Sequence, residues 1–387
     1  MLPTKSPKAD LDYLEINLLI FVFFVFSLSG CGVFDYPESH STFLDSTYRI
    51  KNPLIIPPKT TPKDSLGIPP NPQNPNQKDT NLITNSFYKI LDQFLQANSY
   101  KYDKNILVFI HNKDSLLYTY KEGIYNSEDF LPIASSTKWL TSAVILSLVD
   151  DKKLNLDDKI GQYIPIFNQY NKGEITIRQI FSHTSGIVSD SPFDERSDLT
   201  LKASVDSIAV FTKPLFSPGQ SALYGSSAYK IAARIAEIVD NKPWQIIFEE
   251  RIAKKCNMNN VVFSPSHPQN PHAGAGVVCS LNEYVKFLYM LNNNGYYNGL
   301  KVLSENAINE MDKDQTNNIN PFYGLGVWRY QIRDGKASEL SSPSAMGVHP
   351  WINKEKKYFG IIFTQAGYDK TYDTNLSFRA LVQSIIK

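Results

Sequence analysis

Apolar residues recur at regular spacing from about residue 81 onward. The segment Ile83–Ala97 carries them at helical spacing, which predicts an amphipathic helix. Ile106–His111 and Leu116–Tyr120 are rich in apolar residues and are separated by a turn around Asn112–Lys113, which predicts two strands. Thr137–Val149 is apolar almost all round, which predicts a central buried helix.

Beyond residue 150 the pattern predicts mainly helices and long loops, with strands returning near the end. The clearest later helices are Ala228–Val239 and Asn282–Leu291, and strand patterns reappear at Gly324–Ile332 and Tyr358–Thr364. A last helix is predicted from about Asn375 to Ile386. Helices and strands at both ends, with a helical region between them, predict an α+β fold in which a sheet is flanked by helices and carries a large, mostly helical insertion.

The N-terminal segment has the pattern of a targeting signal. The apolar run Ile16–Leu28 has the length of a signal-peptide core and is too short to span a membrane. It ends in Leu28-Ser29-Gly30-Cys31, which resembles a bacterial lipobox. We therefore expect a lipoprotein signal peptide over residues 1–30 and lipidation at Cys31. A transmembrane anchor or a buried helix is the alternative.

A polar, Pro-rich segment follows over residues 31–80. Each proline fixes φ and removes a backbone donor, so this stretch cannot build a core. We expect an extended, disordered tether that holds a single catalytic domain, residues 81–387, away from a membrane.

Composition narrows the classes of function. Hydrophobic residues make up 42% of the chain and charged residues 20%, and the formal net charge is +1, so nothing favours nucleic acid as a partner. The histidines and cysteines form no metal-binding pattern, and we expect no metal and no cofactor. Cys256 and Cys279 are either a disulfide or two buried free thiols; we favour the free thiols.

Ser135 and Lys138 are the first candidates for chemistry. A serine and a lysine three positions apart share one helix face, and Ser135 stands just before the buried helix. Burial and the helix dipole disfavour a charged lysine, so Lys138 can take the Ser135 proton and activate a weak hydroxyl as a nucleophile. The same S-x-x-K spacing occurs at three other places, where a surface serine and a solvated lysine are the simpler interpretation: Ser86/Lys89, Ser227/Lys230 and Ser384/Lys387.

Two further motifs carry candidate groups. Tyr224 follows the turn at Pro218–Gly219 and precedes a helix; beside a lysine, it can act as a phenolate base or a proton shuttle, because the cation favours the charged form. A core tyrosine is the alternative interpretation. His183, at the start of His183–Gly186, is interpreted as part of a structural turn rather than as a catalytic histidine.

Four more stretches stand in a fixed order between about residue 85 and residue 387. They are Lys153–Asp158 with Tyr163–Pro165, Ile175–Arg178 with His183–Gly186, Pro218–Gly219 with Tyr224–Ser226, and Tyr323–Gly326. Together with Ser135 and Lys138 they resemble the class C β-lactamase-like serine hydrolases, a family that also holds D-Ala-D-Ala carboxypeptidases, D-aminopeptidases and esterases.

The resemblance implies an antiparallel sheet and a set of roles. Ser135 would be the acylated nucleophile, Lys138 its proton partner, and Tyr224 the base in acylation and a group that activates water in deacylation. The oxyanion hole would use the Ser135 N–H and one N–H from the last active-site strand.

Two departures from the family pattern affect the expected substrate. Ser226 stands where the family has an asparagine, and a K-T-G or H-x-G motif is absent. Its nearest counterpart is Ser342-Pro343-Ser344, which puts Ser342, Ser344 and Ala345 at the substrate and oxyanion side. No cation is left there to meet a substrate carboxylate. These changes favour an esterase or a hydrolase of an uncharged amide over an efficient β-lactamase or carboxypeptidase.

The sequence therefore predicts a serine hydrolase that is anchored in the cell envelope and works through a Ser135 acyl-enzyme. We expect a monomer that acts on a small-molecule or peptide substrate, cell-wall material included, and that contacts the outer or cytoplasmic membrane through Cys31. Two alternatives stay open: a penicillin- or wall-binding sensor that kept the fold without turnover, and an adhesion lipoprotein that uses the domain as a scaffold.

Overall fold

The computed structural model describes residues 80–386, with side chains from Tyr88 onward. The expected signal segment, Cys31 and the Pro-rich tether lie outside the described residues. No helix within residues 80–386 is long and apolar enough to cross a membrane.

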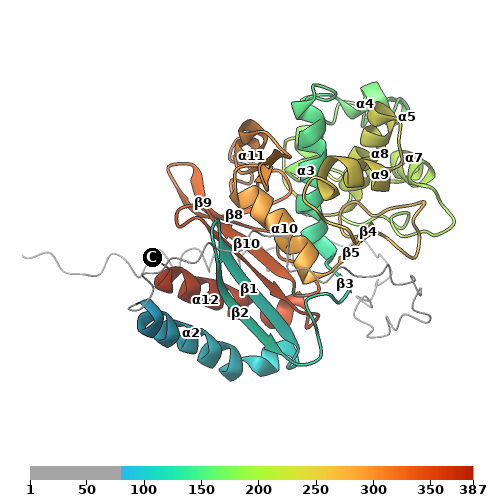
Figure 1. Cartoon of the computed structure of the whole chain (residues 1–387). Helices are drawn as coiled ribbons and strands as arrows, with labels where there is room; N and C mark the ends of the chain where they lie inside the picture. Colours follow the sequence, from blue (N-terminus) through green and yellow to red (C-terminus); the bar gives the residue numbers. More distant parts are fainter. Residues whose placement is uncertain (1–79, 387) are drawn as a thin grey trace, which may run out of the picture. The chain divides into compact units, whose positions relative to one another are not determined.

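Within the described residues, six antiparallel strands form the main sheet in the order β2-β1-β11-β10-β9-β8 (Figure 1). Their bounds are β1 Ile106–Asn112, β2 Leu116–Glu122, β8 Trp328–Arg333, β9 Lys336–Ser341, β10 His349–Asn353 and β11 Tyr358–Phe363. The two ends of the domain meet in the sheet, where β1 pairs with β11. The predicted antiparallel α+β fold is confirmed.

Alternation along β1 explains why the sheet has a core on both faces. Val108 and Ile110 pack with the helices α2 (Thr80–Ala97) and α12 (Tyr368–Ile385) on one face. Leu107 and Phe109 belong to the larger core on the other face. Successive strand residues point to opposite faces, so one strand serves both cores. Figure 1 shows α2 and α12 together on one side of the sheet and α10 on the other.

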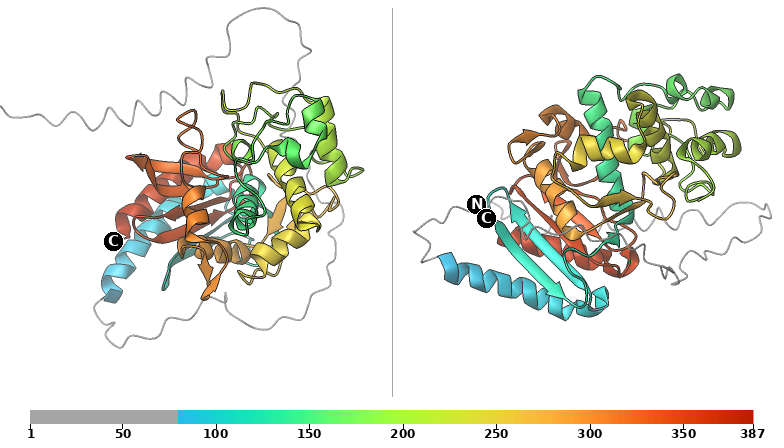
Figure 2. Two further views of the ribbon diagram at one scale, coloured as in Figure 1. Left: turned by 90° about the horizontal axis from the view of Figure 1, so that it is seen from above. Right: turned by 45° about the vertical axis from the view of Figure 1, so that its right-hand side comes forward.

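The larger core fills the helical region between β2 and β8. Its helices are α3 Thr137–Asp150, α4 Ile160–Tyr163, α5 Ile166–Gln169, α6 Ile177–Phe181, α7 Leu201–Phe211, α8 Ser227–Asp240, α9 Trp244–Phe248, α10 Leu281–Asn292 and α11 Glu305–Met311. Short helical turns and strands complete it: η2 Ala134–Ser136, η3 Glu249–Ala253, β3 Leu131–Pro132, β4 Val261–Phe263, β5 Val277–Cys279, β6 Tyr296–Tyr297 and β7 Leu300–Lys301. The turn η1, Ser99–Tyr102, lies outside this region, between α2 and β1. Figure 2 shows this helical region beside the sheet, with α3 running along the boundary.

The predicted central helix is confirmed. From Thr137 to Leu148 every residue of α3 is buried, as an apolar pattern without a polar face requires. Cys256 and Cys279 are both buried and unpaired, which confirms the free-thiol interpretation.

Two predicted elements begin at the wrong residue. The strand expected from Gly324 begins at Trp328, because the preceding glycines pack against other backbone and side chains: a Cβ on Gly324 would lie 2.2 Å from Met311 O, and one on Gly326 would lie 2.0 Å from Ser142 Oγ. The last helix begins at Tyr368 rather than Asn375. Its first two turns are mostly polar, so they show no apolar spacing.

Two central strands, β9 and β10, are not predicted by the sequence pattern. Strand β10 contains Pro350, which cannot donate to a ladder and argues against a central strand. In the structure Pro350 still accepts through its carbonyl, from Ser341 Oγ at 2.7 Å and from Ser342 N at 3.3 Å. The neighbouring strands therefore complete the sheet around it.

Candidate active site

Ser135 lies on the short turn η2, directly before α3. Ala134, which precedes it, has a φ of +40°, a left-handed conformation that residues with a side chain rarely adopt. The turn is held from two sides: Ser136 Oγ donates to Ser342 O at 2.6 Å, and Tyr284 OH donates to Ser136 O at 2.9 Å. The half-buried Ser135 is thus fixed by the end of β9 and by α10.

Lys138, in the first turn of α3, is completely buried and reaches Ser135 as the helical spacing predicts. Its Nζ lies 3.2 Å from Ser135 Oγ. Lys138 Nζ also donates to Ser226 Oγ and to Gly274 O, both at 3.0 Å. Three oxygen atoms from three separate segments therefore hold the amine beside the serine.

The surroundings of Lys138 disfavour its charge. Burial lowers the pKa of Lys138 from its ordinary value to about 7, and the negative charges of Asp190 and Asp194 oppose this lowering. Neither carboxylate forms an ion pair with the amine among the described residues. Lys138 is consequently able to be neutral near pH 7, which a general base for Ser135 requires.

Tyr224 stands on the other side of this amine. The centre of its ring is 4.7 Å from Lys138 Nζ, and its hydroxyl is hydrogen-bonded to Ser135. The ring stacks on Trp328 with the ring centres 5.5 Å apart, and 36% of the side chain is exposed. Tyr224 therefore touches both the candidate nucleophile and the solvent.

The phenolate expected for Tyr224 is not supported. Although part of the ring is exposed, burial around the hydroxyl raises the pKa of Tyr224 to about 12, and the hydrogen bond with Ser135 only partly opposes this. The cation that the expectation invoked is itself disfavoured by burial, which lowers the pKa of Lys138 to about 7. Tyr224 suits a proton shuttle, while Lys138 is the better base.

The three residues predicted on the substrate side lie at different distances from the nucleophile. Ser342 Oγ donates to Ser135 O at 3.3 Å, so Ser342 belongs to the site. Ser344 is buried and Ala345 is exposed, and no hydrogen bond within residues 80–386 links either of them to Ser135. Their part in an oxyanion hole stays a prediction.

One backbone N–H in the segment Ser342–Ala345 has no hydrogen-bond partner among the described residues. Ser342 N donates to Pro350 O, Pro343 has no N–H, and Ser344 N donates to Val348 O at 2.9 Å. Among the described residues, the N–H of Ala345 has no such bond. Ala345 N–H is thus the donor of this segment that has no protein partner among the described residues, and its part in an oxyanion hole stays a prediction.

The predicted turn at His183 is present. Gly186 has a φ of +76°, Gly219 N donates to Thr184 O at 2.8 Å, and Leu223 N donates to His183 O at 2.9 Å. The His183 ring packs against Tyr224, with the ring centres 4.5 Å apart, and burial holds the pKa of His183 well below its usual range. The turn therefore supports Tyr224 from behind.

Three contributors to the site, Gly274, Tyr229 and Trp328, are not predicted by the sequence pattern. Gly274 accepts a hydrogen bond from Lys138 through its carbonyl, which every residue type possesses. Tyr229 places its ring 5.5 Å from Lys138 Nζ, and Trp328 stacks on Tyr224. The aromatic residues gave no signal because aromatic side chains are common in any core.

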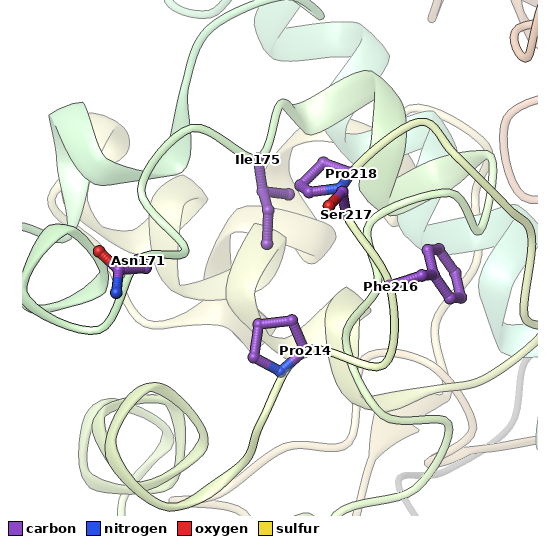
Figure 3. A pocket seen from close by; sticks show the side chains of 6 residues that line it. All are labelled: Asn171, Ile175, Pro214, Phe216, Ser217 and Pro218. Carbon is purple, nitrogen blue, oxygen red and sulfur yellow. The ribbon is translucent and has the colours of Figure 1, made fainter.

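A pocket of about 340 Å³ lies on the helical side of the molecule, beside the Pro218 turn (Figure 3). The residues that line it are Asn171, Ile175, Pro214, Phe216, Ser217 and Pro218. None of Ser135, Lys138 or Tyr224 lines this pocket, so chemistry rather than cavity size identifies the candidate site. Within residues 80–386, no three His, Cys, Asp or Glu side chains gather into a metal-binding group.

Known proteins share this fold, which is that of β-lactamase-like proteins. The family model described as Beta-lactamase matches residues 107–384, and the chain belongs to this family.

The similarity extends to proteins of different activity. A putative β-lactamase from Bacteroides dorei DSM 17855 is 27% identical, with a TM-score of 0.70 over 77% of this chain and 98% of that one. EstCE1, a hydrolase with promiscuous acyltransferase activity, shares the fold at 16% identity, with a TM-score of 0.64 over 78% of this chain and 99% of that one. The D-alanyl-D-alanine-carboxypeptidase/endopeptidase AmpH of Escherichia coli (strain K12) is 26% identical over 35% of this chain and 37% of its own length.

Proposed function

We propose that this protein is a serine hydrolase that acts through an acyl-enzyme on Ser135. The observation that carries the proposal is the 3.2 Å separation of Ser135 Oγ and Lys138 Nζ, with burial bringing the lysine pKa to about 7. A neutral amine in contact with a hydroxyl is the arrangement that turns a serine into a nucleophile.

The proposed reaction follows from these positions. Lys138 Nζ takes the proton of Ser135 Oγ while the oxygen attacks the substrate carbonyl carbon, and the resulting oxyanion is met by the N–H groups of Ser135 and Ala345. Tyr224 passes a proton to the leaving alcohol or amine as the bond to the carbonyl carbon breaks, and Lys138 restores the proton to Tyr224. Water then attacks the Ser135 ester in the same way and releases the acid.

The substrate is proposed to be an ester or an amide without a carboxylate at the scissile end. The segment Ser342–Ala345 carries no charged side chain to meet such a carboxylate. Ser226, in place of an asparagine amide, has its hydroxyl bound to Lys138 Nζ at 3.0 Å. Both features support weak or absent β-lactamase activity.

One observation favours a second candidate, a penicillin- or wall-binding protein that is acylated but not turned over. Burial raises the pKa of Tyr224 to about 12, so almost no phenolate is present near neutral pH, and a second half of the reaction that needed Tyr224 rather than Lys138 to activate water would be slow. A slow second half would leave the acyl-enzyme as the main species.

Labelling of the full chain with a fluorophosphonate separates these possibilities. The probe should form a covalent adduct on Ser135, identified by peptide mass, and Ser135→Ala and Lys138→Ala should remove it. Ser384→Ala is the matched control, because the exposed Ser384 has the same S-x-x-K spacing and should change nothing. No adduct on folded protein would contradict an activated nucleophile.

A turnover assay then decides between hydrolase and binding protein. Steady release of product from p-nitrophenyl esters or uncharged anilides supports the hydrolase. A single burst equal to the enzyme concentration, without further release, supports the acylated binding protein.

A further inference from the structure

The carboxylate of Asp190 stands beside the candidate active site and is not used by the proposed mechanism. Asp190 is exposed, and no hydrogen bond or ion pair within the described residues involves its carboxylate. The neighbouring Asp194 differs: it is buried and accepts from Ser227 Oγ at 2.5 Å. Of these two carboxylates, only Asp190 is available to a bound molecule.

Tight packing fixes the position of Asp190. Ser189 O accepts from Ser226 N at 2.6 Å and from Ser227 N at 3.2 Å. A Cβ on Gly225 would lie 2.3 Å from Ser189 Cα, so the backbones of the two segments are in direct contact. Asp190 therefore follows directly on the residue that is bonded to the Tyr224–Ser226 segment.

The far side of Asp190 is anchored as well. Ser191 N donates to Asp194 Oδ2 at 2.9 Å, and Asp194 N donates to Ser191 O at 3.0 Å. With both flanks held, the exposed Asp190 carboxylate extends from a fixed stretch of backbone next to the Tyr224–Ser226 segment. Its charge acts on the site: Asp190 is the first of the charges that raise the pKa of Lys138 against burial.

Tyr224 and Trp328 form an aromatic surface beside the nucleophile that carries no charge of its own. Tyr224 and Trp328 stack at 5.5 Å with an interplanar angle of 24°, and part of the Tyr224 ring is exposed. The segment Ser342–Ala345 contributes no cation. A carboxylate beside aromatic rings attracts an ammonium group, both by charge and by cation–π interaction, and repels a carboxylate.

We propose that Asp190 is a specificity-determining residue that selects substrates with a positively charged group beside the scissile ester or amide, such as the free amino group of an amino-acid ester or amide. This inference rests on the proposed function, since it assigns the substrate class of the same site. It also accounts for the lack of a cation in the segment Ser342–Ala345, because a site that selects a cationic substrate does not need a cation to bind a substrate carboxylate.

The test uses three fluorophosphonates that differ only in a short tail, which ends in an ammonium, a neutral amide or a carboxylate. The second-order rate of Ser135 labelling is measured for each probe with the full chain. We expect the ammonium probe to react about five- to tenfold faster than the carboxylate probe at low salt, the scale of a partly exposed charge pair. The ratio should fall towards one at about 1 M salt, where the screening length is about 3 Å.

Variants at position 190 should move this ratio in a defined direction. Asp190→Asn should bring the ammonium-to-carboxylate ratio close to one, and Asp190→Lys should invert it. Glu355→Gln is the matched control: Glu355 is exposed, has no ion pair within residues 80–386, and lies in the β10–β11 turn at the end of β10 away from Ser342. An unchanged ratio in both Asp190 variants would overturn the proposal.

A second readout excludes a purely structural role. Loss of the Asp190 charge should lower the Lys138 pKa further, so the rise of labelling rate with pH should move to lower pH in Asp190→Asn. The other charged or titratable groups around Lys138 are Asp194, His183, His272, Tyr224 and Tyr229. They are unchanged in this variant. An unmoved pH profile would contradict the placement of Asp190 beside the amine.

The two proposals fail in different ways. If no probe labels Ser135, the proposed function fails and the inference about Asp190 fails with it. If all three probes label Ser135 at equal rates in the unaltered protein, the nucleophile stands and only the selection of cationic groups is wrong.

Discussion

At the residue scale, burial decides how strongly Lys138 and Tyr224 each hold a proton. Lys138 loses affinity for its proton and Tyr224 gains it, because each charged form would have to exist with little water around it. The usual order of the two pKa values, with lysine slightly above tyrosine, is thereby reversed: the Lys138 amine has a pKa of about 7 and the Tyr224 phenol one of about 12. Lys138 is thereby suited to be the base and Tyr224 to be the proton shuttle.

This order predicts the pH dependence of the reaction. The active form has a neutral Lys138, so kcat/KM for an uncharged ester should rise with pH and level off above a midpoint of about 7. Initial rates between pH 5 and pH 10 would give the midpoint. A rate that stays low near pH 7 and is still rising at pH 10 would instead indicate that the phenolate of Tyr224 is the base.

At the scale of elements, helix α12 is fastened to the sheet by a buried polar cluster. Arg379 on α12 donates to Glu339 Oε1 of β9 at 3.1 Å and to His349 Nε2 of β10 at 2.7 Å, and its guanidinium carbon lies 4.5 Å from the Tyr330 ring centre on β8. Burial keeps the pKa of His349 well below its usual range, which leaves that ring nitrogen able to accept. Three strands are thus tied to one helix by a single side chain.

We expect Arg379→Ala to lower the free energy of unfolding by about 3–5 kcal/mol, because it leaves the Glu339 charge buried without a partner. Urea denaturation of the full chain measures this. Replacing both partners, as in Arg379→Met with Glu339→Leu, should recover most of the loss.

Lys370→Ala is the matched control on the same helix. Lys370 pairs with Asp103 at the surface, where both side chains are well exposed, and its loss should change the free energy of unfolding by less than about 1 kcal/mol. Equal changes in the free energy of unfolding for Arg379→Ala and Lys370→Ala would show that the buried Arg379–Glu339 pair contributes no more to stability than the surface pair.

At the scale of the whole molecule, we propose that the protein is a lipoprotein of the cell envelope, anchored through Cys31. The lipobox pattern Leu28–Cys31 and the Pro-rich tether after it support this proposal. The anchor and the catalytic domain should be separable, because the predicted tether lies between them.

Cys31→Ser should therefore abolish incorporation of labelled fatty acid and move the protein out of the membrane fraction. The rate of Ser135 labelling by a fluorophosphonate should stay the same in detergent. Unchanged fatty-acid labelling in this variant would contradict lipidation at Cys31.

The sequence by itself determined the local features. Ser135 and Lys138 meet because three residues along a helix return to the same face, and α3 is buried because it lacks a polar face. The β1–β2 hairpin also followed from spacing, and the α+β class followed from the order of the predicted elements, whereas the antiparallel sheet was implied by the family resemblance. Each of these depends on residues that are close together in the chain.

Tertiary structure alone decided what surrounds the reacting atoms. Gly274 meets Lys138 across 136 residues and Ser342 meets Ser136 across 206, and no local pattern records such contacts. The pKa values of Lys138 and Tyr224 depend on the same long-range packing. So do the position of Asp190 beside the Tyr224–Ser226 segment and the strand that holds Pro350. Burial and charge are properties of the assembled site, so they appear only when distant segments come together.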